Sequence, residues 1–198
     1  MKMPAPAPPV SGSVIIGGAS SEHKRAESDF YPTPPECVIA LLDTFPSIFG
    51  RNVWEPACGD GAISRVLTGQ GMDVHSTDIR HTGFGQGGVD ALCTTPENID
   101  SIITNPPFSL ATNFIEHLRS FHLPFALLLK ATYWHASRRH ELFKQTGPIA
   151  ICPMLWRPNF APDRGRSPTM DFCWTVWTDA PVTTCEYIPI PKPRTHQP

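Results

Sequence analysis

Four consecutive residues, Asn105-Pro106-Pro107-Phe108, have the types and the order that could hold an amino group in place for a reaction. The side-chain oxygen of Asn105 and the carbonyl oxygen of Pro106 are both hydrogen-bond acceptors. The two prolines have fixed φ angles and no N–H groups, so these acceptors lie on a stiff backbone. A site that must accept two hydrogen bonds from one amino group would use this arrangement, and we call these four residues the tetrad.

The elements around the tetrad are what would position it. Residues 101–104, Ser-Ile-Ile-Thr, form an apolar, β-branched run that predicts a buried strand, and a helix is predicted to start at Ser109. Open α/β sheets bind their ligands at the carboxyl ends of the strands. The tetrad therefore lies where such a fold would place a ligand site, although the same four residues could also form an ordinary turn.

A second group of candidate residues follows two other predicted strands. Gly59-Asp60-Gly61 comes after a strand at residues 53–55. Glycines at this place would let the backbone approach a ligand closely. The N-terminus of the following helix would favour a carboxylate group of that ligand. Asp78 ends the strand at residues 74–77, about 20 residues beyond this loop, where an acid can hold the ribose hydroxyls of an adenosine cofactor. Alternatively, Gly59-Asp60-Gly61 could be a common glycine turn, and Asp78 could be a helix cap or a surface acid.

Alternating strands and helices are predicted along the rest of the chain. Thr33 as N-cap, Pro34 at the first helical position and Glu36 three residues after the cap predict the start of the first helix. The further elements are a flexible glycine-rich loop at 83–88, a short element at 89–92, a helix at 110–118, a central strand at 125–129 and a short basic helix at 137–145. Residues 149–156 and 170–177 are predicted to pair as an antiparallel hairpin. This order predicts an α/β three-layer sandwich.

Length and composition favour a single domain. The 198 residues are 40% hydrophobic, enough for one well-buried core, which we place at residues 28–188. Prolines concentrate at both ends, so residues 1–27 and 189–198 are predicted to be disordered tails. No apolar run of 18 residues exists, which predicts a cytoplasmic protein without a membrane partner. The six cysteines show no C-x-x-C pair and no metal-ligand spacing, so no metal site is expected.

The charges are unevenly distributed along the chain. Residues 1–129 hold 7 Lys and Arg against 13 Asp and Glu, whereas residues 130–166 hold 7 Lys and Arg against 2 Asp and Glu. A basic segment beside an acidic half suggests a polyanion that is contacted on one face only. The alternative is an ordinary solvated surface.

Taken together, the sequence resembles the amino-group DNA methyltransferases that methylate adenine N6 with S-adenosylmethionine. Three matches occur in the family's order: Tyr31-Pro32-Thr33-Pro34, Glu55-Pro56-Ala57-Cys58-Gly59-Asp60-Gly61, and the tetrad. The chain looks most like the compact enzymes of phages and prophages. The resemblance implies a class I methyltransferase Rossmann-like three-layer sandwich, with a mostly parallel seven-stranded sheet and a C-terminal antiparallel hairpin.

The same resemblance implies the roles of individual residues. Asn105 and Pro106 would accept the two hydrogens of the adenine amino group, on the scaffold that Pro107 completes, and Phe108 would stack on the base. Asp90 would accept from the amino group of the cofactor's adenine, while Tyr31 and Thr33 would lie near its methionine moiety; Thr33 could also be only a helix cap. The full cofactor set is Tyr31, Thr33, Glu55, Ala57, Gly59, Gly61, Asp78 and Asp90.

Contacts to nucleic acid are expected from the basic segment. In the predicted hairpin, Trp156 and Phe160 would face the base, although Trp156 could equally pack in the core. The full set of candidates is Lys130, Arg138, Arg139, Trp156, Arg157, Phe160, Arg164 and Arg166. The only candidates for a target-recognition region are residues 131–147 and 157–169, which predicts short or relaxed sequence specificity. A protective role for phage DNA against host restriction is implied by the resemblance to phage enzymes.

Three other functions stay open at this point. The same tetrad serves RNA adenine methyltransferases and, with Tyr in the last position, protein glutamine methyltransferases. Phe108 and the basic hairpin favour nucleic acid, without excluding RNA. A module that binds S-adenosylmethionine or DNA without catalysis is the third alternative, but it would not need the acceptor pair of Asn105 and Pro106. The sequence does not indicate an oligomeric state.

Overall fold

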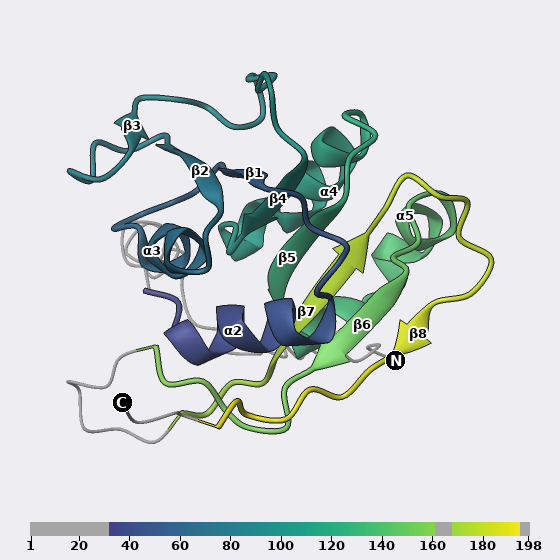
Figure 1. The fold of residues 1–198 in the computed structure, drawn as a ribbon. Helices are drawn as coiled ribbons and strands as arrows, with labels where there is room; N and C mark the ends of the chain where they lie inside the picture. Colours follow the sequence, from purple (N-terminus) through teal and green to yellow (C-terminus); the bar gives the residue numbers. More distant parts are fainter. Residues whose placement is uncertain (1–31, 161–167, 195–198) are drawn as a thin grey trace, which may run out of the picture.

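A single mixed β-sheet runs through the molecule (Figure 1). The computed structural model describes residues 32–160 and 168–194, and in this part of the chain the sheet has eight strands. They are β1 (Asn52–Glu55), β2 (Asp73–Asp78), β3 (Gln86–Gly87), β4 (Ser101–Thr104), β5 (Phe125–Lys130), β6 (Ala150–Pro153), β7 (Phe172–Trp177) and β8 (Glu186–Tyr187). The helices are α2 (Pro35–Thr44), α3 (Ala62–Gly69), α4 (Ala111–Arg119) and α5 (His140–Gln145), with 3-10 turns η1 (Phe108–Leu110), η2 (Ala131–Trp134) and η3 (Ser137–Arg139).

The strand order is β3-β2-β1-β4-β5-β7-β6-β8. The first five strands pair in parallel, whereas β7 is antiparallel to both β5 and β6. The predicted fold class and terminal hairpin are therefore confirmed. The predicted number of seven strands is one too few, because Glu186 and Tyr187 add β8 in parallel to the outer edge of β6.

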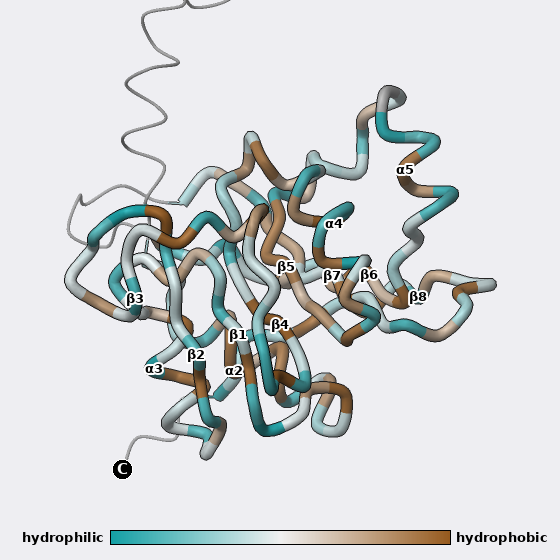
Figure 2. Tube along the Cα trace, turned by 90° about the horizontal axis from the view of Figure 1, so that it is seen from above, coloured by the Kyte–Doolittle hydropathy of each residue, from teal (hydrophilic) through white to brown (hydrophobic). Residues whose placement is uncertain are grey.

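Helices cover both faces of the sheet, as three layers require. On one face, Val38 and Leu41 of α2 and Leu67 of α3 pack against the strands, and on the other face Phe114 and Leu118 of α4 do so. The central strands β5 and β7 are buried along almost their whole length. Figure 2 shows the hydrophobic segments gathered in the middle of the sheet, with more polar segments towards β3 and α5. Apolar burial on both faces of the sheet is the main source of its stability.

Three local predictions need correction. Helix α2 begins at Pro35 with Pro34 as its N-cap and no side-chain cap, so Thr33 does not cap it. The helix predicted from Ser109 starts with the 3-10 turn η1, and the α-helix begins at Ala111. The glycine-rich run predicted as a flexible loop is packed, since Gln86 and Gly87 pair with β2 as β3.

The ends of the chain differ from the predicted tails in one respect. Residues 1–27 lie outside the described residues. Of residues 189–198, however, Ile190 is buried in the core and exchanges backbone hydrogen bonds with Pro153 and Leu155. The ordered domain therefore extends beyond residue 188. None of the described helices is long and apolar enough to span a membrane.

Candidate active site

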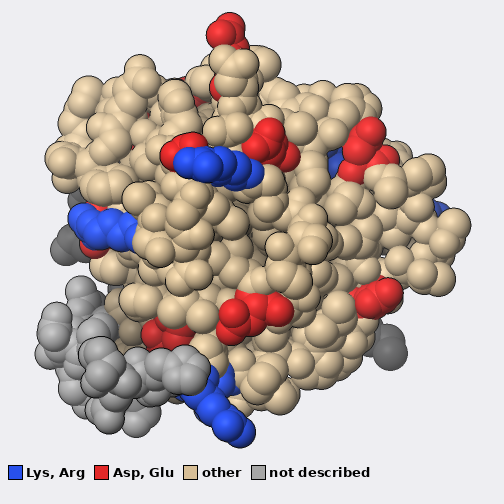
Figure 3. Space-filling model, in the orientation of Figure 1, with Lys and Arg blue, Asp and Glu red and all other residues tan. Residues whose placement is uncertain are grey.

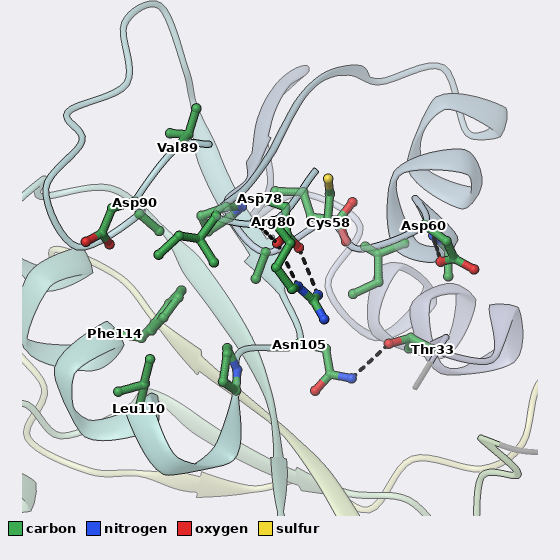
Figure 4. A pocket seen from close by; sticks show the side chains of 18 of the residues that line it. Thr33, Cys58, Asp60, Asp78, Arg80, Val89, Asp90, Asn105, Leu110 and Phe114 are labelled. Atoms are coloured by element: carbon green, nitrogen blue, oxygen red, sulfur yellow. Dashed lines mark hydrogen bonds and ion pairs between the residues drawn. The ribbon is translucent and has the colours of Figure 1, made fainter. Parts of the chain in front are cut away.

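A cavity of about 290 Å³ opens at the carboxyl ends of β1, β2 and β4 (Figure 4). This is the edge of the sheet at which α/β folds bind ligands. Its lining comes from five segments: Pro32 and Thr33; Glu55 to Cys58 with Asp60, Ala62 and Ile63; Asp78 to Arg80; Val89 to Leu92; and Asn105, Pro107, Ser109, Leu110 and Phe114. The fold thus brings parts of all three sequence matches to one cavity. Gly59, Gly61, Pro106 and Phe108 are not among its lining residues, and Tyr31 lies outside the described residues.

The amide of Asn105 is hydrogen-bonded to Thr33. Its Nδ2 donates a hydrogen bond of 3.1 Å to Thr33 Oγ1, as Figure 4 shows. Its Oδ1 is buried and has no hydrogen-bond partner among the described residues. A buried acceptor without a partner is unfavourable by about 1–3 kcal/mol, which makes it a candidate to bind a donor from a ligand.

The ring of Phe108 lies just outside this cavity. It is half-buried against Phe172, with the ring centroids 5.9 Å apart, and Lys130 Nζ lies 4.3 Å from its centroid. A base that stacked on the face covered by Lys130 would first have to displace the ammonium group. Phe108 lines a second, smaller cavity together with Lys130.

The glycine loop before α3 is shaped by two glycines with positive φ angles. Gly59 has φ of 55° and Gly61 has φ of 85°, values that L side chains rarely adopt. A Cβ atom at Gly61 would also collide with the ring of Phe84, which lies against the loop. The glycine-rich run therefore supports the loop, a role that the sequence did not reveal.

Asp78 ends β2 as predicted, but its carboxylate already has four donors. It accepts from the backbone N–H of Gly59 at 2.9 Å and of Arg80 at 2.8 Å, and from Arg80 Nε at 3.0 Å and Nη2 at 3.1 Å. Burial alone would raise the pKa of Asp78, but the hydrogen bonds from Arg80 and Gly59 outweigh it and hold the pKa below its ordinary value. The carboxylate is therefore ionised, and a ligand hydroxyl would have to share it with Arg80.

Glu55 is a buried carboxyl group in the wall of the cavity. It is 1% exposed, and burial raises its pKa to about 8, although the Ser64 hydroxyl donates to it and lowers the pKa in part. Ser64 in turn lies 2.6 Å from the hydroxyl of Ser76. At neutral pH, Glu55 is therefore mostly protonated, unlike Asp78 on the neighbouring strand.

Asp90 also lines the cavity and is exposed. Its carboxylate accepts from the backbone N–H of Leu92 at 2.9 Å and from Cys93 Sγ at 3.5 Å, so it organises its own turn. Ala57 also lines the cavity. Sequence reasoning missed Ile79 and Arg80 in this wall, although both directly follow Asp78, and it also missed Leu110 and Phe114.

The predicted nucleic-acid contacts are spread over different surroundings. Trp156 and Phe160 pack against the core, and the Phe160 ring lies 4.6 Å from that of Phe172. Arg157 is exposed and forms a 2.8 Å ion pair with Asp171. Lys130 and Arg139 line the small cavity beside Phe108. Arg164, Arg166 and the side chain of Arg138 lie outside the described residues.

The face of the molecule drawn in Figure 3 carries charges of both signs. On the side that carries α2 and α3, Figure 3 shows Lys and Arg side chains interspersed with Asp and Glu, and neither sign forms a continuous patch there. Within residues 32–160 and 168–194, no cluster of three His, Cys, Asp or Glu side chains could hold a metal ion. All six cysteines are free thiols.

No protein-family model and no curated protein matches the sequence, but solved structures match its fold. A Listeria monocytogenes protein, provisionally named a class I S-adenosylmethionine-dependent methyltransferase, is similar over 79% of this chain and 65% of its own, with a TM-score of 0.57 and 13% identity. The chain has the class I methyltransferase fold. A Pyrococcus horikoshii protein provisionally named an RNA methyltransferase gives a TM-score of 0.59 at 15% identity, over 75% of this chain and 85% of its own.

A dimethyladenosine transferase of Plasmodium falciparum is a third similar structure, with a TM-score of 0.52 and 16% identity over 74% of this chain and 62% of its own. At these identities the likeness concerns the fold alone. The chain spans about two thirds of the length of the Listeria protein. The substrate must therefore be argued from the site.

Proposed function

We propose that this protein transfers a methyl group from S-adenosylmethionine to the N6 amino group of adenine in DNA. The observation that carries the proposal is the amide of Asn105. Its Nδ2 donates a hydrogen bond to Thr33, which leaves Oδ1 as a buried acceptor without a partner among the described residues. An amino group bound at this position would satisfy that acceptor.

The chemistry requires the chain to activate a weak nucleophile. The lone pair of an exocyclic adenine amine is delocalised into the ring. Asn105 Oδ1 and the carbonyl of Pro106 accept its two hydrogens, which draws the nitrogen towards sp3 geometry. S-adenosylmethionine, when bound, supplies a methyl group on a positively charged sulfur. The amine nitrogen forms a bond to this carbon as the carbon–sulfur bond breaks, and one amino proton leaves to solvent. Positioning and fixed dipoles supply the rate enhancement.

The residues of the larger cavity fit this cofactor in their chemistry. Asp78 would hold the ribose hydroxyls. For this, Arg80 must release at least one of its two side-chain hydrogen bonds to the Asp78 carboxylate. Asp90 would accept from the adenine amino group. The loop of Gly59 and Gly61 would bring the start of α3 towards the methionine carboxylate, although the N–H groups of the two glycines already donate to Asp78 and to the carbonyl of Cys58.

We expect a short or relaxed sequence specificity, because this chain offers few segments that could read the bases. A duplex adenine must be flipped out to reach the tetrad, at a cost of a few kcal/mol, and is then held by stacking. Residues 131–147 and 157–169 are the segments available to read neighbouring bases. Such an enzyme could protect phage DNA from restriction.

The test is transfer of labelled methyl from S-adenosylmethionine to unmethylated duplex DNA and to RNA, followed by nucleoside analysis. We expect N6-methyladenine in DNA. N105A should lower kcat by about 100-fold or more, as loss of a single catalytic hydrogen-bonding group does, while cofactor binding persists. N113A, which removes an exposed amide on α4, is the matched control and should retain activity.

Each other outcome favours an alternative. Methylation of RNA alone would make the protein an RNA adenine methyltransferase. Cofactor binding without transfer to either nucleic acid would overturn the proposal, in favour of a protein glutamine substrate or a non-catalytic binding module.

A further inference from the structure

A second cavity, of about 120 Å³, lies beside the tetrad. It is formed at the carboxyl end of β5, where η2 and η3 follow the strand, and Phe108, the last residue of the tetrad, lines it. At about 30 Å³ per water molecule, this space corresponds to about four waters. A phosphate group is of this size, and the cavity is too small for the cofactor proposed above.

The charged residues that line this cavity are cationic. Lys130 and Arg139 both line it, and none of its lining residues among those the structure describes is an Asp or Glu. Within the described part of the chain, neither side chain forms an ion pair with a carboxylate. Arg51, Arg80, Lys144, Arg157 and Lys192, in contrast, each pair with one. Two cations without a carboxylate partner in one small cavity favour an anionic ligand.

Arg139 is already held in place for such a ligand. Its Nη1 donates a 2.6 Å hydrogen bond to the carbonyl of Tyr133, and its guanidinium group lies 4.0 Å from the centroid of the Tyr133 ring. Tyr133 is itself buried and hydrogen-bonded through its hydroxyl to Thr112. Because the guanidinium group is already fixed, Arg139 would lose less side-chain entropy when a ligand binds.

Lys130 links this cavity to the tetrad. Its ammonium group lies over the Phe108 ring, a cation–π contact that is weak at a partly exposed site. A charge-assisted hydrogen bond to a phosphate oxygen is stronger than this contact. A phosphate in the cavity would therefore draw Lys130 off the ring and free that face of Phe108 for a base.

We propose that this cavity binds a backbone phosphate next to the adenosine whose base enters the tetrad. The inference rests on the proposed function and deepens it, because it names a nucleic-acid strand as the substrate. Lys130 and Arg139 contact the phosphate, and the movement of Lys130 couples phosphate binding to base stacking on Phe108.

The experiment measures binding rather than methyl transfer. A fluorescent duplex with one central adenine is titrated with the protein at several salt concentrations. K130Q and R139Q should each weaken binding by about tenfold and reduce the salt slope by about one, because one phosphate contact is lost. K192Q and R51Q, which remove cations already paired with Glu36 and Asp73, are the matched controls and should bind as wild type does.

A second measurement locates the phosphate. A neutral methylphosphonate linkage is placed at successive positions on either side of the adenine. At one position it should weaken wild-type binding by about tenfold, while the double variant K130Q/R139Q, which has lost both cations of the site, should lose little more. Equal losses in K130Q and K192Q, or no dependence on the position of the neutral linkage, would overturn the proposal.

The two proposals can fail separately. If no methyl is transferred to nucleic acid but binding still depends on Lys130 and on one linkage, the phosphate site stands and the proposed function falls. If N6-methyladenine forms but K130Q and R139Q bind as wild type does, the phosphate site falls. Unchanged binding of S-adenosylmethionine by each variant confirms that the domain is folded.

Discussion

Asn105 and Thr33 are 72 positions apart in the chain, and the hydrogen bond between them decides which end of the Asn105 amide is left for a ligand. An amide has a donor end and an acceptor end of nearly the same shape. With Thr33 as the acceptor for Nδ2, the free end is the oxygen. In this orientation the Asn105 amide presents an acceptor to the cavity, as the binding of an amino group requires.

Replacement of Thr33 by valine should weaken catalysis without disturbing the fold. T33V keeps the branched shape but removes the hydroxyl, so the Asn105 amide can turn its N–H groups towards the incoming amine. We expect kcat to fall by about tenfold, which corresponds to the net worth of about one hydrogen bond. T33S, which retains the hydroxyl, is the control. Equal kcat values for T33V and T33S in the methyl-transfer assay would contradict this role.

Arg80 should compete with the cofactor for Asp78. R80A removes two of the four donors to this carboxylate, so it leaves a buried charge less well satisfied in the free protein. We expect a lower melting temperature without ligand and a larger increase in it on addition of S-adenosylmethionine, with affinity tighter by about two- to fivefold because this partly exposed ion pair is worth about 1 kcal/mol or less. Calorimetry and thermal melts measure both quantities. R51A is the matched control, and weaker cofactor binding by R80A would show that Arg80 helps to hold the cofactor.

At the scale of the elements, the glycine loop and the run that contains β3 form one unit. The Phe84 ring lies against Gly61, and Arg65 of α3 lies 4.9 Å from the centroid of the same ring. The loop is therefore fixed from both sides, by α3 and by the segment that leads into β3. The effects on stability of substitutions in these two segments should therefore depend on each other.

A double-mutant cycle that compares G61A, F84A and the variant with both substitutions tests this coupling. G61A should be destabilising by about 1–2 kcal/mol from the positive φ angle alone, and by more because of the collision with Phe84. F84A removes the collision, so the two changes together should be less destabilising than the sum of the single changes. Urea unfolding gives the free energies. Simple additivity would show that the ring and the glycine act independently.

The sequence predicted the elements better than their contacts. Strong periodicity identified the sheet, the hairpin and the place of the tetrad after β4. Thr33 was assigned as a cap because its hydroxyl suits that role locally, whereas the contact with Asn105 is tertiary. Phe84 was read as part of a flexible glycine run because its packing partner, Gly61, is distant in sequence. The two-residue strand β8 is too short to show any alternation.

For the whole molecule, the buried carboxyl group of Glu55 makes stability depend on pH. The group has an ordinary pKa of 4.5 in the unfolded chain and about 8 in the folded protein. Between these values the folded state holds the proton that the unfolded state has lost. The contribution of Glu55 to stability is therefore complete below about pH 4.5 and is lost as the pH rises to about 8.

E55Q should remove this dependence. The wild-type free energy of unfolding should fall between pH 5 and 8, relative to E55Q, by up to about 1.4 kcal/mol per pH unit. The side-chain carbonyl of glutamine can still accept the Ser64 hydrogen bond, so the variant should fold. Urea unfolding at several pH values measures the difference, and E97Q, which changes an exposed acid, should follow wild type. Parallel curves for wild type and E55Q would mean that Glu55 is ionised in the folded protein.

Among residues 32–160 and 168–194, those that line the cavity at the carboxyl ends of β1, β2 and β4 all lie between Pro32 and Phe114. The strand that completes the middle of the sheet, β7, begins at Phe172. During synthesis on the ribosome, these lining residues have therefore all emerged while β5 still has one unpaired edge. An unpaired apolar edge is prone to intermolecular association. The nascent chain thus contains the segments that line the cavity before β7 is available to pair with β5. Binding of the cofactor could stabilise the chain at this stage.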